Sequence, residues 1–290
     1  MAITVHRGLH NQSRWSLQRL RCIYFTTWPD ANQGNLSDPM SPLARDDYDT
    51  LQTPFCWFKA DDLELSDGDL VSSWDSDGVS LTQGTSDDLK PVFKSNIING
   101  HSVVRFDGVD DFLQTTTIDF VTFLVTEDDS FNFITEDGDE LILEGEEQTG
   151  LSTIIVFKQA VSQFEVAMSF GDSGYTFWTG TNGGGSMVAI SNSHTDIVTG
   201  AGDTNWHAMQ GVQDFDTGVF NGWDFENQGS PPDIHTSSYG NNILSVGGYK
   251  ESASLPFGGD IAEIMVFDVP LNGMSRTYYV NYIKNKYALD

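Results

Sequence analysis

Short apolar runs separated by turn residues fill the chain from residue 54 onward and predict β-strands. TPFCWFKA (53–60) and LSTIIVFKQ (151–159) are nearly continuous apolar runs, as expected for strands buried on both faces. Shorter runs such as SVVRFDGVDDFLQ, FEVAMSFGDSGYTFWTG and GGDIAEIMVFD are interrupted by Gly and Asp, which favour tight turns. Asn221-Gly222 is a preferred pair for two-residue hairpins, so a turn is predicted there. The pattern predicts an all-β chain.

The end of the chain is the exception, because NGMSRTYYVNYIKNKYALD has helical spacing. Tyr279, Ile283 and Tyr287 recur every four residues and would share one face of a helix. Asn272 stands where a helix N-cap is expected, since its side chain can accept a hydrogen bond from the first turn. We therefore predict one short C-terminal helix.

Two segments differ from the strand-rich part. Residues 1–50 are irregular and predict an extended anchoring arm or linker, with a short helix over 13–21; a disordered tail is the alternative, although Trp15 and Trp28 are unusually apolar for one. Residues 125–148 hold ten acids and no base, with FNFIT and ELILE on either side of an Asp-Gly turn. We predict a sandwich domain over 51–290 that carries an acidic hairpin insertion at about 119–150.

Charge is distributed unevenly along the chain. The 42 acids and 14 bases give a formal charge of −28, yet residues 1–29 carry +4 and no acid, which leaves −32 on the remainder. Such a body should repel nucleic acid, because phosphate binding requires cationic surface. No apolar run is long enough to predict membrane insertion, and the N-terminus lacks the apolar core of a secretory signal. We expect the chain to fold in the compartment where it is made.

The two cysteines, Cys22 and Cys56, do not suggest a disulfide scaffold. Cys56 lies in the apolar run PFCWF and is predicted to be a small core residue. His207, after Trp206 at the start of a predicted strand, is interpreted as structural.

Five blocks together resemble the laminin-G-like, concanavalin-A-like domains: FKADDLELSDGDLVSSWDSDG, KPVFKSNIINGHSVVRFDGVDDFLQ, LSTIIVFK, NWHAMQGVQDFDTGVFNG and GGDIAEIMVFDVPLNGMSRTYYVNYIKNKYAL. The resemblance covers about 54–290 apart from the insertion, and it implies a jelly-roll sandwich of two antiparallel sheets. Such domains usually bind glycans or proteins, some bind calcium at one rim, and a few relatives are glycoside hydrolases. ITEDGDELILEG in the insertion is similar to acidic repeats of tailed-phage structural proteins.

The sequence gives no support for catalysis. Glycoside hydrolysis needs two carboxylates about 5–9.5 Å apart, which the hydrolase relatives place on one strand as glutamate-x-aspartate-x-x-glutamate. Asp260 and Glu263 are three residues apart, which predicts opposite faces of a strand, and Glu165 stands alone. We therefore expect a protein that is not an enzyme.

Candidate binding residues fall into two groups. No cofactor is required by the sequence, but calcium is left open at the Asp-Gly turns, with Asp67, Asp69, Asp110 and Asp111 as candidates; ordinary turn residues are the alternative. For glycan binding the candidates are aromatic residues near glycine-rich turns, and the alternative is that they pack inward. Tyr175 and Phe177 share one strand face and Trp178 takes the other. The glycan-binding candidates are Tyr175, Trp178 and Trp223.

The arm suggests a function for the whole chain. A lectin-like domain without an export signal is typical of a virion protein, which is assembled in the host cytoplasm and exposed on the released particle. We predict a structural protein of a tailed phage, which is a capsid decoration, a head fibre or a tail fibre. It would form homo-oligomers and contact capsid or tail proteins. The sandwich would be displayed toward host-surface glycans. The alternatives are a bacterial carbohydrate-binding adhesion module and a polysaccharide depolymerase. The predicted anchoring residues are Arg7, Arg14, Trp15, Arg19, Arg21 and Trp28, and the alternative is that the arm packs back on its own domain.

Overall fold

The computed structural model describes residues 51–76, 78–116, 118, 149–161, 163–171, 177–182, 186–190, 194–198, 203–229, 233–234, 243–249 and 255–289. All of them belong to the larger of two units into which the chain divides, Leu43–Asp290. The predicted arm (1–50) and nearly all of the acidic insertion (119–148) lie outside the described residues.

The first sheet has nine antiparallel strands among the described residues. Their order is β14-β13-β12-β7-β17-β5-β4, with β1 paired to β17 and β15 paired to β13. The bounds are β1 (Cys56–Lys59), β4 (Val92–Ile98), β5 (His101–Asp107), β7 (Gly150–Gln159), β12 (His207–Asp214), β13 (Val219–Asp224), β14 (Asn227–Gln228), β15 (Asp233–Ile234) and β17 (Gly258–Phe267).

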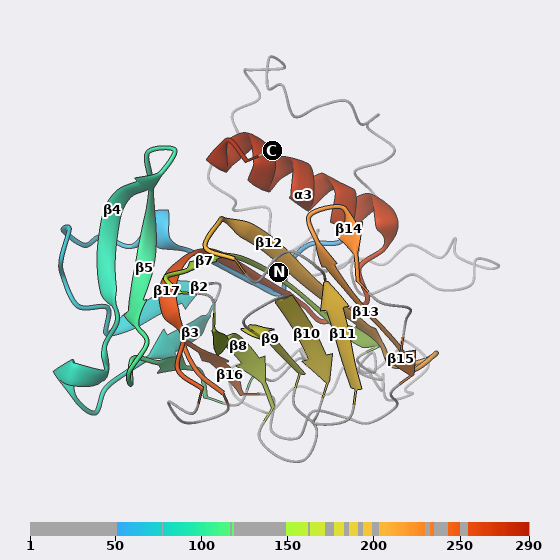
Figure 1. The fold of residues 1–290 in the computed structure, drawn as a ribbon, viewed down its shortest axis with the longest axis horizontal. Helices are drawn as coiled ribbons and strands as arrows, with labels where there is room; N and C mark the ends of the chain where they lie inside the picture. The colour runs from blue at the N-terminus through green and yellow to red at the C-terminus, as the bar shows by residue number, and fades with distance from the viewer. Residues whose placement is uncertain are drawn as a thin grey trace, which may run out of the picture. The chain divides into compact units, whose positions relative to one another are not determined.

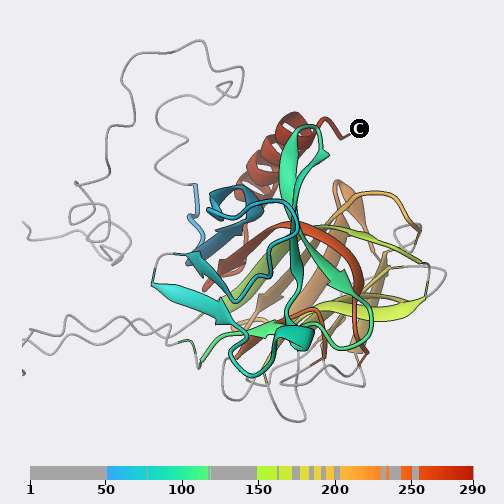
Figure 2. The same cartoon turned by 90° about the vertical axis from the view of Figure 1, so that its left-hand side faces the viewer.

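The second sheet has eight antiparallel strands in the described part of the chain, in the order β11-β10-β9-β8-β16-β6-β3-β2. The bounds are β2 (Ser73–Ser76), β3 (Val79–Thr82), β6 (Leu113–Gln114), β8 (Phe164–Phe170), β9 (Phe177–Asn182), β10 (Ser186–Ile190), β11 (His194–Val198) and β16 (Leu244–Val246). Two short 3-10 helices, η1 (Ala60–Asp62) and η2 (Asp87–Leu89), join strands. The sheets form two layers (Figures 1 and 2), which confirms the predicted fold class, an all-β sandwich of two antiparallel sheets.

The core lies between the two sheets, where apolar side chains of alternate residues meet. Phe157 and Ile264 from the first sheet and Met168 and Phe170 from the second belong to this cluster and are fully buried. Alternation explains the arrangement, because successive strand residues point to opposite faces. Cys56 is also fully buried here, which confirms its predicted place in the core.

The outer face of the first sheet is covered by the helix α3 (Gly273–Tyr287), shown in red in Figure 1. The Oδ1 atom of Asn272 accepts a hydrogen bond from the backbone N–H of Ser275 at 2.8 Å, so the predicted N-cap is confirmed. Tyr279, Ile283 and Tyr287 are buried against the sheet, as their spacing predicts. Among the described residues, no helix combines the length and apolarity needed to cross a membrane.

The predicted turn at Asn221-Gly222 is wrong, because both residues lie inside β13, opposite Val212 and Gly211. The chain turns earlier, over 215–217. There the Oδ1 atom of Asp214 accepts hydrogen bonds from the backbone N–H groups of Asp216 and Thr217, and Gly218 adopts a φ of 72°. A side chain that caps the earlier turn outweighs the hairpin preference of the later pair.

The prediction that Asp260 and Glu263 lie on opposite faces is also wrong. Asp260 pairs with Arg105 and Lys158, whereas the next residue, Ile261, belongs to the core between the sheets. A β-bulge between Ile261 and Glu263 then adds one residue to the strand. Because an extra residue resets the alternation, Asp260 and Glu263 both face outward.

Glu263 is a fully buried carboxylate beneath α3. Its Oε1 atom accepts hydrogen bonds from Trp57 Nε1 at 2.6 Å and from the Tyr282 hydroxyl at 3.1 Å, and its Oε2 atom accepts one from the Tyr287 hydroxyl at 2.8 Å. The ammonium group of Lys286 lies 3.5 Å from Oε2. Burial and the charge of Glu263 raise the pKa of both tyrosines, so they remain neutral donors. One carboxylate thus joins β1, β17 and the helix.

The substitution Glu263→Ala should lower the free energy of unfolding by about 3–5 kcal/mol, because it leaves the hydroxyls of Tyr282 and Tyr287 and the indole N–H of Trp57 without their acceptor. Lys286 keeps its ion pair with Asp61 at 3.1 Å. The matched control is Glu226→Ala, which removes a surface ion pair to Lys284 of the same helix and should cost less than about 1 kcal/mol. Urea denaturation of the two variants measures the difference. Equal losses would contradict the role given to the buried carboxylate.

Candidate functional site

Three neighbouring strands of the first sheet reach the same end of the sandwich. These are the last residues of β5 and β7 and the first residues of β17, which lies between them. The strand register sets Arg105 beside Asp260 and Asp260 beside Lys158. Paired residues of neighbouring strands share one face of a sheet, so the three charged side chains stand together on the outer face.

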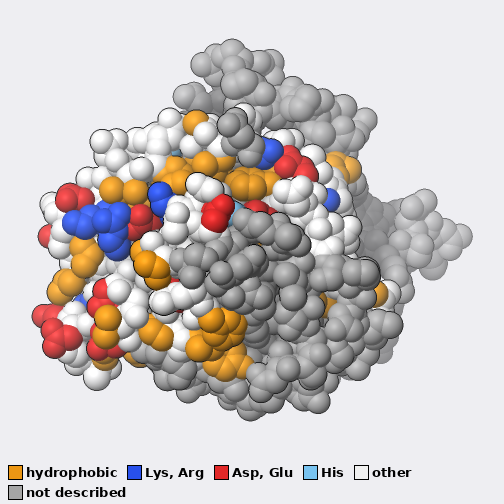
Figure 3. All heavy atoms as spheres, in the orientation of Figure 1, with side chains coloured by type: hydrophobic (Ala, Val, Ile, Leu, Met, Phe, Trp, Pro, Cys, Tyr) orange, Lys and Arg blue, Asp and Glu red, His pale blue; other side chains and the backbone are white. Residues whose placement is uncertain are grey.

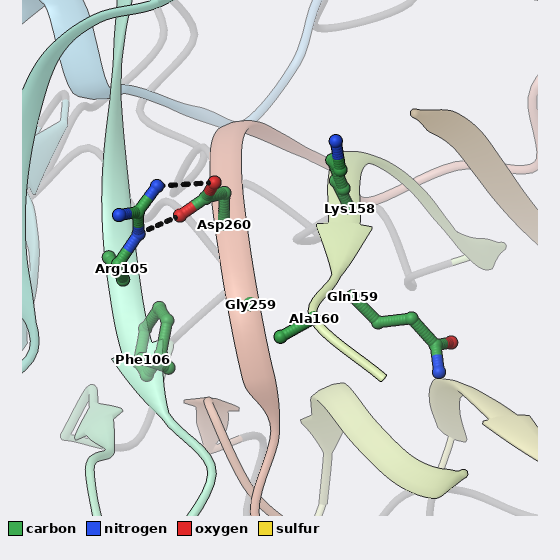
Figure 4. Close-up of a pocket in the computed structure, with 7 residues that line it drawn as sticks. All are labelled: Arg105, Phe106, Lys158, Gln159, Ala160, Gly259 and Asp260. Atoms are coloured by element: carbon green, nitrogen blue, oxygen red, sulfur yellow. Dashed lines mark hydrogen bonds and ion pairs between the residues drawn. The ribbon is translucent and has the colours of Figure 1, made fainter. Parts of the chain in front are cut away.

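The strand ends enclose a hollow with a volume of about 240 Å³, which we call the rim hollow. In Figure 4, Arg105 and Asp260 point toward each other across β5 and β17, and Lys158 stands on the far side of β17. The paired Arg105 and Asp260 thus line one side of the hollow, and Lys158 lines the other. Its lining residues are Arg105, Phe106, Lys158, Gln159, Ala160, Gly259 and Asp260.

Arg105 and Asp260 form a bidentate ion pair within the rim hollow. The Nε atom of Arg105 donates to Oδ1 at 2.6 Å, and its second terminal nitrogen donates to Oδ2 at 2.9 Å. The hydrogen bonds that Arg105 donates to Asp260 raise the pKa of Arg105, against the opposing effect of burial. Both carboxylate oxygens are thereby engaged by one planar guanidinium group, which fixes its orientation.

Lys158 has a different environment from Arg105. Its side chain is partly exposed, and among the described residues no ion pair joins its ammonium group to a carboxylate. Arginine and lysine side chains also gather over β4 and β5 on the face seen in Figure 3. Cations are scarce in this chain, with 14 against 42 acids, so a local excess of positive charge is unusual for it.

Gly259 forms the floor of the rim hollow and cannot be replaced without a shift of the backbone. A Cβ atom at this position would lie 2.3 Å from the carbonyl oxygen of Lys158. Such a distance is far below the usual contact distance between carbon and oxygen, so the floor remains bare backbone. Gly108 and Gly258 approach each other closely next to it, since a Cβ on Gly108 would lie 3.1 Å from the Cα of Gly258.

The loop after β5 carries three carboxylates beside the rim hollow, which we call the aspartate loop: Asp107, Asp110 and Asp111. One oxygen of each lies within 4.8 Å of the others. Asp107 Oδ1 accepts the backbone N–H of Val109 at 2.8 Å, and Asp111 Oδ2 accepts that of Asp107 at 2.9 Å. Burial, followed by the charges of Asp107 and Asp110, raises the pKa of Asp111 to about 6.

The separation of these three oxygens is compatible with three of the ligands of one calcium ion. Calcium bonds oxygen at about 2.3–2.6 Å, so two ligands of one ion are at most about 5 Å apart. The structure thus brings the predicted Asp110 and Asp111 together with Asp107. Asp67 and Asp69 are separate: Asp67 accepts the backbone N–H of Ser95 and faces Lys94, and Asp69 accepts that of Ser66.

The loops at this end expose apolar side chains. Val109 is 67% exposed, Val161 is 50%, Phe164 is 45% and Leu255 is 37%. Val161 follows the hollow-lining Ala160, and Val109 belongs to the aspartate loop. Apolar surface next to convergent polar groups is the usual composition of a ligand site.

The predicted glycan-binding aromatic residues lie elsewhere or outside the described residues. Trp223 packs with the cluster under α3, where the Arg276 guanidinium lies 4.5 Å from its ring centre. Strand register pairs Trp178 with Ser169 and Phe177 with Phe170. Tyr175 is not among the described residues, nor are the arm residues. Glycan binding by these aromatic residues stays a prediction.

His207 lies between two carboxylates, away from the rim hollow. Its Nδ1 atom is 2.9 Å from Asp224 and its Nε2 atom is 3.0 Å from Asp203. Burial alone would lower the pKa of His207, but hydrogen bonds and charges from Asp224 and Asp203 raise it. When the ring is protonated both nitrogens donate, and the two contacts tie β12 to β13 and to the preceding loop.

Sequence reasoning missed Arg105, Lys158 and Gly259 as site residues. Each lies in a strand-forming run, and nothing in its local sequence distinguishes it from a surface residue. The one available signal was the scarcity of bases in this acidic chain, which makes any strand Lys or Arg worth attention.

The pH dependence of stability should report on the aspartate loop. Asp111 has a folded pKa of about 6, above its usual value of 3.8, so its contribution to stability is present below pH 3.8 and is lost as pH rises through 6. In a chelator, Asp111→Asn should therefore raise the unfolding free energy by on the order of 2 kcal/mol near pH 7 and change it little near pH 4.

Millimolar calcium should reverse this ranking near neutral pH, since a cation offsets the repulsion in the wild-type loop and finds one ligand fewer in the variant. Thermal unfolding with chelator and with calcium measures both effects, with the exposed Asp88→Asn as the control. A wild-type melting temperature that does not respond to calcium would exclude a calcium site in the aspartate loop.

No protein-family model matches the sequence, and no curated protein is significantly similar to it. Solved structures are similar in fold. The CBM40 module of the Ruminococcus gnavus IT-sialidase bound to α2,3-sialyllactose has a TM-score of 0.39 at 14% identity, covering 46% of this chain and 82% of that one. The Trypanosoma rangeli sialidase in complex with sialic acid has a TM-score of 0.47 at 6% identity, covering 79% of this chain and 32% of that one. The receptor binding domain of botulinum neurotoxin type G has a TM-score of 0.45 at 6% identity, covering 80% of this chain and 51% of that one.

Proposed function

We propose that this protein binds carbohydrate without being an enzyme, and that the rim hollow holds one sugar unit. The observation that carries the proposal is the row of charged side chains formed by Arg105, Asp260 and Lys158 on three neighbouring strand ends, beside the bare backbone of Gly259. Guanidinium and ammonium groups donate hydrogen bonds and a carboxylate accepts them. A ligand with several hydroxyls, each both donor and acceptor, matches such a set.

The size of the rim hollow supports a small polar ligand. Its volume of about 240 Å³ lies below the roughly 300–1,000 Å³ of sites for drug-sized molecules. One ring of a saccharide would occupy it, and the rest of the chain would extend over the neighbouring loops. The exposed Val161 and Val109 offer apolar contact there, which a sugar ring can use through its C–H faces.

We propose binding without catalysis because of how two carboxylates are held. These are Asp260 and Glu263, which the bulge in β17 brings to one face of the sheet. Glycoside hydrolysis needs an acid and a second carboxylate on either side of the scissile bond. Glu263 is fully buried beneath α3 and Asp260 is held by Arg105 through both oxygens, so neither is free to act on a bound sugar. This arrangement supports binding rather than hydrolysis.

A glycan array probed with the purified full chain tests the proposal, and binding to at least one glycan is expected. Arg105→Lys should reduce affinity for it about tenfold or more, because lysine keeps the charge but loses the fork that orients Asp260. The matched control is Arg276→Lys. Arg276 belongs to α3 and packs on the ring of Trp223, away from the hollow, so this variant should bind glycan as the wild type does. Absence of all glycan binding, or equal binding by both variants, would overturn the proposal.

A second function, attachment to a virus particle, is favoured by the charge asymmetry of the sequence. Residues 1–29 carry +4 beside −32 on the remainder, so the arm would be attracted to an acidic protein surface that the body avoids. We propose that the arm anchors the protein to a capsid or tail protein of a tailed phage, which would place the sandwich on the released particle. The anchoring residues in this proposal are Arg7, Arg14, Trp15, Arg19, Arg21 and Trp28.

Removal of residues 1–29 should abolish incorporation into purified particles and leave the folded body intact, because the two sheets and α3 that the structure describes are formed by residues beyond 50. Mass spectrometry of particles counts the incorporated copies, and circular dichroism of the truncated chain checks its fold. Particles that contain the truncated and the full chain in equal numbers would contradict the anchoring role, as would particles that lack the full chain altogether.

A further inference from the structure

The rim hollow has a net positive charge on a strongly acidic protein. Its three charged residues are Arg105, Lys158 and Asp260, which sum to one positive charge. The whole chain carries −28. Counter-charges are therefore abundant in the molecule, yet among the described residues none forms an ion pair with Lys158.

Asp260 does not neutralise Lys158, although the two residues are direct neighbours in the strand register. Both of its oxygens accept hydrogen bonds from Arg105, at 2.6 and 2.9 Å, so its charge is directed away from β7. Figure 4 shows the same division, with the dashed contacts on one side of β17 and the Lys158 side chain on the other. The partly exposed ammonium group is thereby left without an ion pair among the described residues and remains accessible to a ligand.

An anionic group is the natural partner for this ammonium. Hydrogen bonds in which one partner is charged are about twice as strong as neutral ones, and a carboxylate can accept two at once. The carboxylates of the aspartate loop stand beside the hollow but are not among its lining residues, and physiological salt screens the more distant charges of the body beyond roughly 8 Å. The charge next to the ligand therefore decides its preference.

We propose that the rim hollow is selective for a saccharide that carries a carboxylate, with Lys158 binding that carboxylate. This inference rests on the proposed function, and it goes further by naming the class of sugar and the residue that selects it. The bare floor at Gly259 lets the ring approach the backbone, and the Arg105–Asp260 pair faces its hydroxyls. Hexuronic acids and sialic acids share this chemistry.

Titration of the full chain with four probes tests the selection: a hexuronic acid oligosaccharide, sialylated lactose, and the carboxyl-reduced form of each. Calorimetry should give tighter binding of at least one acidic probe than of its reduced form, by about ten- to a hundredfold, the range expected for one charged hydrogen bond. The probe that shows the difference identifies the kind of acid.

The variant Lys158→Met keeps the length of the side chain and should remove that preference while retaining the weaker binding of the reduced form. Lys94→Met is the matched control, since Lys94 stands on β4 beside Asp67 and outside the hollow, and it should keep the preference. Equal binding of acidic and reduced probes, or a preference that survives Lys158→Met, overturns the acidic-sugar inference and leaves carbohydrate binding standing. No binding of any probe, together with a blank glycan array, overturns both.

Discussion

The buried carboxylate of Glu263 is the constraint on which the outer layer of this protein depends. A charge in the interior is tolerated only when hydrogen bonds and a counter-charge replace water. Trp57 supplies a donor from β1, and Tyr282, Tyr287 and Lys286 supply the others from α3. The helix is therefore held over the sheet by polar contacts at one point as well as by its apolar face, which fixes its position along the strands.

The bulge in β17 connects this constraint to the rim hollow. Strict alternation would direct either Asp260 or Glu263 into the apolar core between the sheets, where a carboxylate finds no donors. One extra residue between Ile261 and Glu263 lets Ile261 and Ile264 remain in the core while both acids face outward. The buried carboxylate of β17 and the carboxylate that lines the rim hollow are thus both placed by the same irregularity.

Local signals in the sequence were enough for the fold but not for the site. The run 151–159 and the helix from Asn272 to Tyr287 follow from apolar spacing and a cap, which act over a few residues. The turn at Asn221-Gly222 and the faces of Asp260 and Glu263 were predicted wrongly, because the capping by Asp214 and the bulge compete with those local rules. Asp110 and Asp111 were found because both stand in one turn, whereas Arg105 and Lys158 meet only when β5 and β7 flank β17.

The bare backbone at Gly259 limits which positions of the proposed site can be substituted during evolution. A Cβ at this position would meet the backbone of β7, so variation at the proposed site is expected in the side chains around Gly259 and not at Gly259 itself. Lys158 is one such position, because its side chain forms no ion pair among the described residues. If the hollow binds a sugar as proposed, a single substitution at Lys158 would change the ligand preference and leave the backbone of the cavity as it is.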